Sequence, residues 1–229
     1  MSEWWTYRPS DFLMFAPDTY WRLFELHNAA WWPLGLLANV LVLALSLALW
    51  QGHPRAARLG TGLMAALSAL VAWGFVWRLY VPINWGAQAL VGLYLIAALG
   101  WLLLSGAAAV ARRARVGTLL LLMAALSWPL MALADGRPFV QAELIGLAPD
   151  PTAVAGLGLL LHVRPDSRAG HGLWWVLLAL GVLVCLISAA TLATMEQGLA
   201  FAPLAAAAIA LGAALARRNR PRHRSDAVA

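Results

Sequence analysis

The chain has 229 residues, of which 62% are hydrophobic and only 11% charged, whereas soluble domains carry about a quarter charged residues. A water-soluble fold is excluded because it could not bury this much apolar surface. All sixteen basic residues are arginine, which excludes Schiff-base chemistry and therefore retinal binding. The net charge of +6 resides in segments between apolar runs, a pattern typical of membrane topology signals rather than of nucleic-acid binding.

The spacing of polar and apolar residues over 18–32 predicts an amphipathic helix that lies on the membrane surface. At 100° per residue, Asp18, Arg22 and Glu25 share one face of this helix. The apolar and aromatic residues of the opposite face are Tyr20, Phe24, His27 and Trp31. We expect the chain to leave this interfacial helix and enter the bilayer at Pro33.

Seven apolar runs predict seven membrane spans, because a bilayer core of roughly 30 Å requires about 20 residues. They cover residues 31–50, 59–77, 86–110, 116–134, 147–163, 172–193 and 199–216. The fifth run is the shortest, and we expect it to cross as a short helix that follows the irregular stretch 136–151. The predicted fold is therefore an all-α polytopic transmembrane helix bundle, with an N-terminal segment 1–32, a transmembrane bundle 33–216 and a tail 217–229.

The arginines predict the orientation of the bundle. Twelve of the sixteen lie in alternate connections and in the C-terminal tail, while the N-terminal segment and the other connections hold four arginines and eight of the ten acids. The positive-inside rule then places the N-terminus in the periplasm and the C-terminus in the cytoplasm. The arginines of the tail, which would attract anionic lipid, are Arg217, Arg218, Arg220, Arg222 and Arg224.

Three short motifs carry a resemblance to a known family. They are Asn-Ala-Ala-Trp-Trp-Pro at 28–33, Ile-Asn-Trp-Gly-Ala-Gln at 83–88 and Pro-Asp-Pro-Thr at 149–152. The chain resembles a bacterial family of multi-pass membrane proteins that is defined only as a domain of unknown function. The resemblance implies a bacterial inner-membrane location and a bundle of six to seven helices, and it implies no reaction. Where the family pattern has tyrosine before the asparagine, this chain has His27.

Polar side chains on the predicted outer side form the candidate binding site, because such groups are costly within a membrane. The selected residues are His27, Asn28, Arg78, Asn84, Gln88, Glu143, Asp150 and Thr152. If the fifth helix begins below the surface, its N-terminal N–H groups point into the same space. The pattern predicts an outward-facing vestibule that binds or transports a small polar solute or ion.

Two alternatives remain open at this stage. The outer residues can be ordinary interfacial groups, with Arg78 or Arg137 paired to Asp135 or Glu143. The protein can also be an accessory or scaffold subunit of a larger membrane complex. The sequence contains no recognisable enzyme motif or metal-ligand spacing, so we expect no catalytic activity, cofactor or metal. We expect His162 to reach the surface or to bond a backbone carbonyl.

Overall fold

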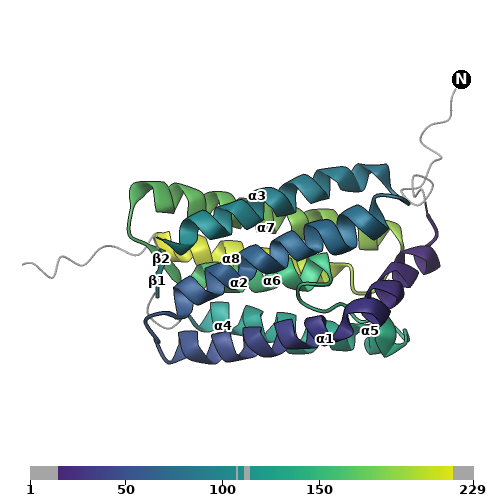
Figure 1. The fold of residues 1–229 in the computed structure, drawn as a ribbon, viewed down its shortest axis with the longest axis horizontal. Helices are drawn as coiled ribbons and strands as arrows, with labels where there is room; N and C mark the ends of the chain where they lie inside the picture. The colour runs from purple at the N-terminus through teal and green to yellow at the C-terminus, as the bar shows by residue number, and fades with distance from the viewer. Residues whose placement is uncertain (1–14, 107, 111–113, 219–229) are drawn as a thin grey trace, which may run out of the picture.

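We describe the chain in a computed structural model, which covers residues 15–106, 108–110 and 114–218. The helices pack side by side in an elongated bundle, and two short strands pair at one of its ends (Figure 1). We call this end, where β1 (Ala108–Val110) and β2 (Val163–Pro165) lie, the strand end. The opposite end, where residues 81–84, 135–138 and 195–200 connect neighbouring helices, is called the acidic end.

The first helix differs from the prediction of a separate interfacial helix. Helix α1 runs without interruption over Pro17–Trp50, with Pro33 inside it. Its first turns incline to the rest of the helix and lie across the acidic end (Figure 1), as expected where a proline removes a backbone hydrogen bond. The predicted apolar face packs against protein, because the rings of Phe24 and Phe75 are 4.5 Å apart. This contact explains why residues 18–32 do not form an independent surface helix.

Among the described residues, six helices are long and apolar enough to cross a membrane, as in a multi-pass membrane protein. Some of them combine several helical segments. They are α1; α2 (Ala56–Leu70) with the π-helix η3 (Val71–Tyr80); η4 (Trp85–Ala87) with α3 (Gln88–Ser105); α4 (Arg115–Leu122) with the π-helix η5 (Met123–Ser127) and α5 (Trp128–Ala134); α7 (Arg168–Thr194); and α8 (Phe201–Arg218). Six of the seven predicted runs therefore correspond to a helix of spanning length.

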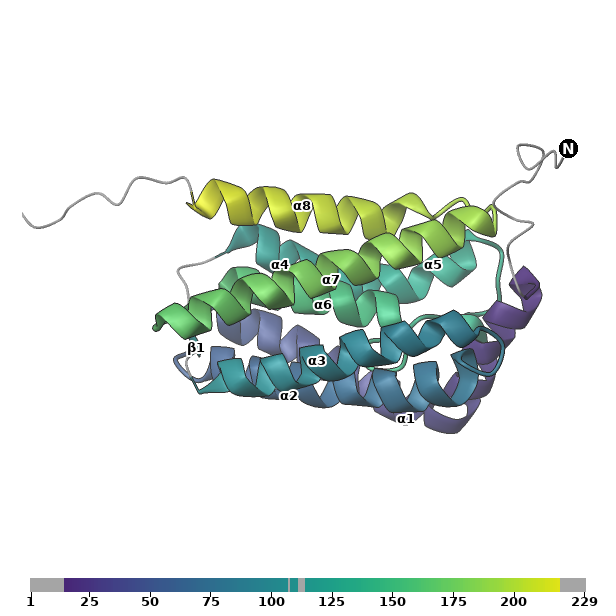
Figure 2. The same cartoon turned by 90° about the horizontal axis from the view of Figure 1, so that it is seen from above.

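The fifth predicted run forms a shorter helix, α6, over Pro149–His162. Its 14 residues rise about 21 Å at 1.5 Å per residue, less than the roughly 30 Å of a bilayer core. All residues of α6 are buried, because α2, α4, α7 and α8 pack around it and enclose it at the centre of the bundle (Figure 2). Pro149 and Pro151 lie in the first turn of α6. Because proline is favoured there but not further inside a helix, the helix begins only at Pro149.

The strands fix the direction in which α6 runs. β1 pairs antiparallel with β2, so that Val110 lies opposite Val163 directly after α6. The chain enters residues 135–148 from α5 at the acidic end, and it leaves α6 at the strand end (Figure 1). An irregular segment followed by a short helix therefore connects the two ends of the bundle at the fifth predicted run, for which the sequence indicated a short helix after an irregular stretch.

A close backbone contact holds α4 against α6. A Cβ atom built on Gly158 would lie 2.9 Å from the carbonyl oxygen of Gly117, and a Cβ atom on Gly117 would lie 2.7 Å from the carbonyl oxygen of Gly158. Neither carbonyl can rotate away without breaking helical hydrogen bonds. Glycine at both positions therefore permits the approach of the two helices, as in small-residue contacts of membrane helices.

We predict that Gly158→Ala lowers the free energy of unfolding by about 1–3 kcal/mol, because the added methyl group overpacks this contact. Thermal unfolding in detergent measures the effect. Gly92→Ala in α3 is the matched control, since a Cβ atom there would meet nothing within 4 Å. Equal melting temperatures for the two variants would contradict the close contact.

Candidate functional site

The connection between α5 and α6 enters the bundle instead of remaining at its surface. Leu144 and Leu147 each have a methyl carbon 2.7 Å from the position that a Cβ atom on Gly35 would take. Gly146 has φ +80°, and its Cβ position would lie 2.6 Å from Leu67. The segment therefore lies between α1 and α2, and Gly146 satisfies both a backbone and a steric requirement.

Two polar side chains satisfy the backbone of this buried segment. The Asn28 amide donates to the carbonyl oxygens of Val140 and Ala142, both at 2.8 Å. The Thr152 hydroxyl accepts from the Gly146 amide at 2.7 Å and donates to the Ala148 carbonyl at 2.7 Å. Buried backbone groups require such partners, so Asn28 and Thr152 hold the segment in place.

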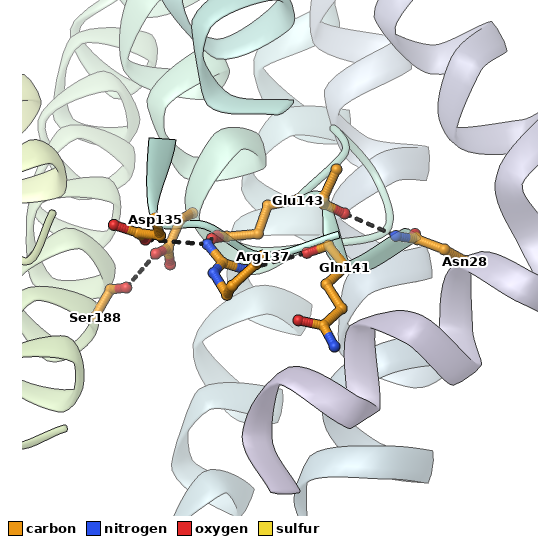
Figure 3. Close-up of polar contacts among 8 residues, drawn as sticks. Asn28, Asp135, Arg137, Gln141, Glu143 and Ser188 are labelled. Carbon is orange, nitrogen blue, oxygen red and sulfur yellow. Dashed lines mark hydrogen bonds and ion pairs between the residues drawn. The ribbon is translucent and has the colours of Figure 1, made fainter. Parts of the chain in front are cut away.

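Arg137 lies at the centre of a group of charged residues at the acidic end (Figure 3). Its guanidinium group is 3.3 Å from the Asp135 carboxylate and 3.9 Å from that of Glu143. The same guanidinium lies 3.4 Å from the ring centroid of Trp21, a cation–π arrangement. These contacts match the predicted alternative in which Arg137 pairs with Asp135 or Glu143.

Asp150 is the most deeply buried acid of this region, with 3% of its surface exposed. It accepts a hydrogen bond from the Ser188 hydroxyl of α7 (Figure 3), and it does not cap its own helix, which lacks a side-chain cap. The Tyr94 hydroxyl of α3 donates to the neighbouring Pro149 carbonyl at 2.5 Å. Side chains from α3 and α7 therefore fix the first turn of α6.

Asp135, Arg137, Glu143 and Asp150 line one cavity together with Trp21 and other residues. About 10 Å³ of this cavity is open to the centre of a water-sized sphere, which is room for about one water molecule. Three carboxyl groups face a single guanidinium there. Two buried donors of the lining, the indole Nε1 of Trp21 and the Nε of Arg137, have no hydrogen-bond acceptor in the described part of the chain.

The electrostatics of the cavity favour a bound proton. Burial raises the pKa of Glu143 above its ordinary value of 4.5, and the nearby Asp150 carboxylate raises it further. The Arg137 guanidinium and a hydrogen bond with Trp128 act in the opposite direction. The carboxyl group of Glu143 therefore takes up a proton at a higher pH than an exposed glutamate.

The structure brings four of the predicted site residues together, namely Asn28, Glu143, Asp150 and Thr152, all at the buried segment or at the first turns of α6. The other four lie elsewhere. His27 packs against Phe75 and Gly74, the exposed Arg78 lies over Trp73, Asn84 accepts from the Gly86 amide, and Gln88 is exposed. Arg78 therefore does not share the cavity with Glu143.

Sequence reasoning missed Trp21 and Ser188 at this site. Neither residue is among the candidate site residues of the sequence analysis, but both lie beside buried acids. Ser188 lies six residues before the end of α7. A serine at this place in a long apolar run could have indicated a polar partner on a neighbouring helix. The attraction of anionic lipid to the tail stays a prediction. Arg217 donates to the carbonyl oxygens of Leu161 and Val163, and Arg220, Arg222 and Arg224 lie outside the described residues.

The chain matches the profile of a family of unknown function, DUF6064, over residues 17–223. It belongs to this family. The match confirms the resemblance to a family of unknown function that the sequence motifs indicated, and it extends from the start of α1 beyond the end of α8. No curated protein and no solved structure matches the chain. The chemistry of this DUF6064 member must therefore be argued from its own residues.

We predict that Asn28→Ala lowers the free energy of unfolding by about 1–3 kcal/mol, because it leaves the buried Ala142 carbonyl and the partly buried Val140 carbonyl without this donor. Thermal unfolding in detergent measures the loss. Gln88→Ala removes an exposed amide at the same end and should change stability by less than about 0.5 kcal/mol. An unchanged melting temperature for Asn28→Ala would show that the segment does not depend on this side chain.

We also predict that stability falls as the pH rises above 4.5. The folded protein keeps a proton on Glu143 that the unfolded chain releases, so the unfolding free energy decreases with pH up to the raised pKa. One carboxyl group contributes up to about 1.4 kcal/mol per pH unit. Unfolding measured from pH 5 to 8 should show a smaller slope for Glu143→Gln, and an unchanged slope for the exposed Glu196→Gln. Equal slopes in all three proteins would contradict the raised pKa.

Proposed function

We propose that the protein takes up and releases protons at the carboxyl groups of Glu143 and Asp150, as one step of proton movement across the membrane. The observation that carries the proposal is the composition of the cavity at the acidic end. It combines buried carboxyl groups with two donors for which the described residues provide no acceptor. Ionisable groups buried in membrane proteins commonly mark ion pathways and proton relays.

The mixture of donors and acceptors favours a proton carried through water over a bare metal cation. A water molecule can accept from Trp21 or Arg137 and donate to a carboxylate, whereas an alkali-metal cation satisfies only the carboxylates. The space for about one water molecule also disfavours an organic solute. These two arguments narrow the predicted ligand from a small polar solute or ion to the proton.

The arginine distribution supports an orientation for this proposal. The arginines at the strand end, in its loop, in β2 and in the adjoining first turns of α2, α4 and α7, include Arg55, Arg58, Arg115, Arg164 and Arg168. By the positive-inside rule the strand end would face the cytoplasm and the acidic end the periplasm. The membrane would be a bacterial inner membrane, as the family resemblance implies. Proton entry would then occur from the outer side.

Proton flux into liposomes tests the proposal. The full chain is reconstituted into vesicles that contain a pH-sensitive dye, and a potassium diffusion potential drives protons inward. We expect flux above that of empty vesicles, and we expect Asp150→Asn and Glu143→Gln to reduce it about tenfold or more, since each removes a proton-binding group. Asp18→Asn, which changes an exposed acid of α1, is the matched control and should retain the flux.

Two results would overturn the proposal. The first is the absence of flux above empty vesicles for a folded wild-type protein. The second is sodium uptake that depends on Asp150 without proton flux, which would assign the cavity to an alkali-metal cation. The alternative, an accessory subunit of a larger complex, predicts a different pair of results. The folded protein would show no flux in liposomes, and it would retain a stoichiometric partner after detergent extraction.

A further inference from the structure

His162 is a second buried ionisable group, at the opposite end of α6 from Asp150. The two residues are 12 positions apart, which corresponds to about 18 Å along a helix. His162 is 0% exposed, although it lies at the strand end, where the sequence suggested that it would reach the surface or bond a backbone carbonyl. A fully buried histidine at this place requires a physical explanation.

The ring of His162 has one partner and one free nitrogen. Its Nε2 lies 3.1 Å from the Thr118 hydroxyl oxygen of α4, while its Nδ1 has no hydrogen-bond partner in the described part of the chain. The ring also occupies the space beside Gly117, where a Cβ atom would lie 2.8 Å from its Cδ2. The contact between α4 and α6 therefore fixes the ring and directs Nε2 at Thr118.

The charged groups near His162 are arginines. Arg217 of α8 donates to the carbonyl oxygens of Leu161 and Val163, on either side of the histidine. Arg164 follows on β2 with an exposed side chain. No carboxylate pairs with His162 within the described ranges, so the ring is not half of a structural ion pair.

Thr118 connects the histidine to the outside of the bundle. It lines an open groove between α1 and α4 together with Leu43, Ser46, Leu47, Trp50 and Leu122. About 300 Å³ of this groove is open to the centre of a water-sized sphere. The Thr118 hydroxyl donates a long hydrogen bond, 3.4 Å, to the Ala114 carbonyl oxygen. Because a hydroxyl group can rotate, and can donate and accept hydrogen bonds at the same time, Thr118 can link the buried ring to groups in the groove.

Polar groups also lie between His162 and the acidic end. A cavity beside the first half of α6 has about 30 Å³ open to the centre of a water-sized sphere, and its lining includes Ser68, Tyr94 and Thr152. This space is sufficient for about two water molecules. Because Tyr94 bonds the Pro149 carbonyl next to Asp150, the cavity begins close to the proposed proton site.

We propose that His162 is the proton-exchanging group at the strand end, and that it passes protons to the open groove through the Thr118 hydroxyl. The protonated imidazole gives its Nε2 proton to the Thr118 oxygen while the Thr118 hydroxyl proton passes to a water molecule in the groove, so the imidazole becomes neutral and water is the only acceptor needed. This inference rests on the proposed function, and it adds a second group at the opposite end of the helix.

Flux measurements on strand-end variants test the inference in the same dye-loaded liposomes. We expect His162→Gln and Thr118→Val to reduce proton flux about tenfold or more. His171→Gln is the matched control, because His171 is an exposed histidine of α7 at the same end. His162→Ala should regain flux when imidazole is added, and this rescue would not follow from a purely structural role.

The outcomes separate this inference from the proposed function. If Asp150→Asn loses flux while folded His162→Gln and Thr118→Val retain it, the role of His162 is overturned and the proton site at the acidic end stands. If the folded wild-type protein shows no flux, the proposed function itself is overturned. If His162→Gln melts at a lower temperature, its loss of flux could reflect misfolding, and the other two variants decide the role of His162. Normal flux in Thr118→Val, or failure of imidazole to restore flux in His162→Ala, overturns the inference.

Discussion

The structure depends on satisfying the backbone of one irregular segment inside an apolar bundle. Residues 142–148 are buried without forming a regular helix, and a lipid environment offers no water to pair their amide and carbonyl groups. Asn28 and Thr152 provide partners from the flanking helices, and Gly146 and Gly35 provide the space. The depth at which α6 begins follows from these few contacts.

The same segment explains why acids are buried at this end. By entering the bundle it carries Glu143 inward, and the start of α6 brings Asp150 beside Ser188 of α7. Arg137 supplies one positive charge, which it shares between Asp135 and Glu143. The carboxyl groups outnumber the guanidinium, so protons are the simplest means of balancing the charge. The path of this segment into the bundle therefore determines both the buried position of the acids and the excess of carboxyl groups over the Arg137 guanidinium.

The sequence predicted the helical class and the positions of six long spans, because runs of about 20 apolar residues are a strong signal. It also predicted an irregular stretch before a short fifth helix, because the fifth apolar run is the shortest. The continuity of α1 through Pro33 could not be predicted, since it depends on the packing of Phe24 against Phe75. Similarly, nothing local to the sequence distinguishes Arg137, which reaches the buried acids, from Arg78, which lies over Trp73. Side-chain partners across the bundle are set by tertiary contacts, and sequence periodicity does not report them.

The complete enclosure of α6 by protein has a consequence for how the molecule is made. A helix of 14 residues, preceded by polar backbone without regular structure, is poorly suited to remain in lipid on its own. Two of the helices that surround it, α7 and α8, are synthesised after it. The enclosure of α6 is therefore completed only after α7 and α8 have been synthesised, so its final packing cannot form while the chain is still being made up to this point.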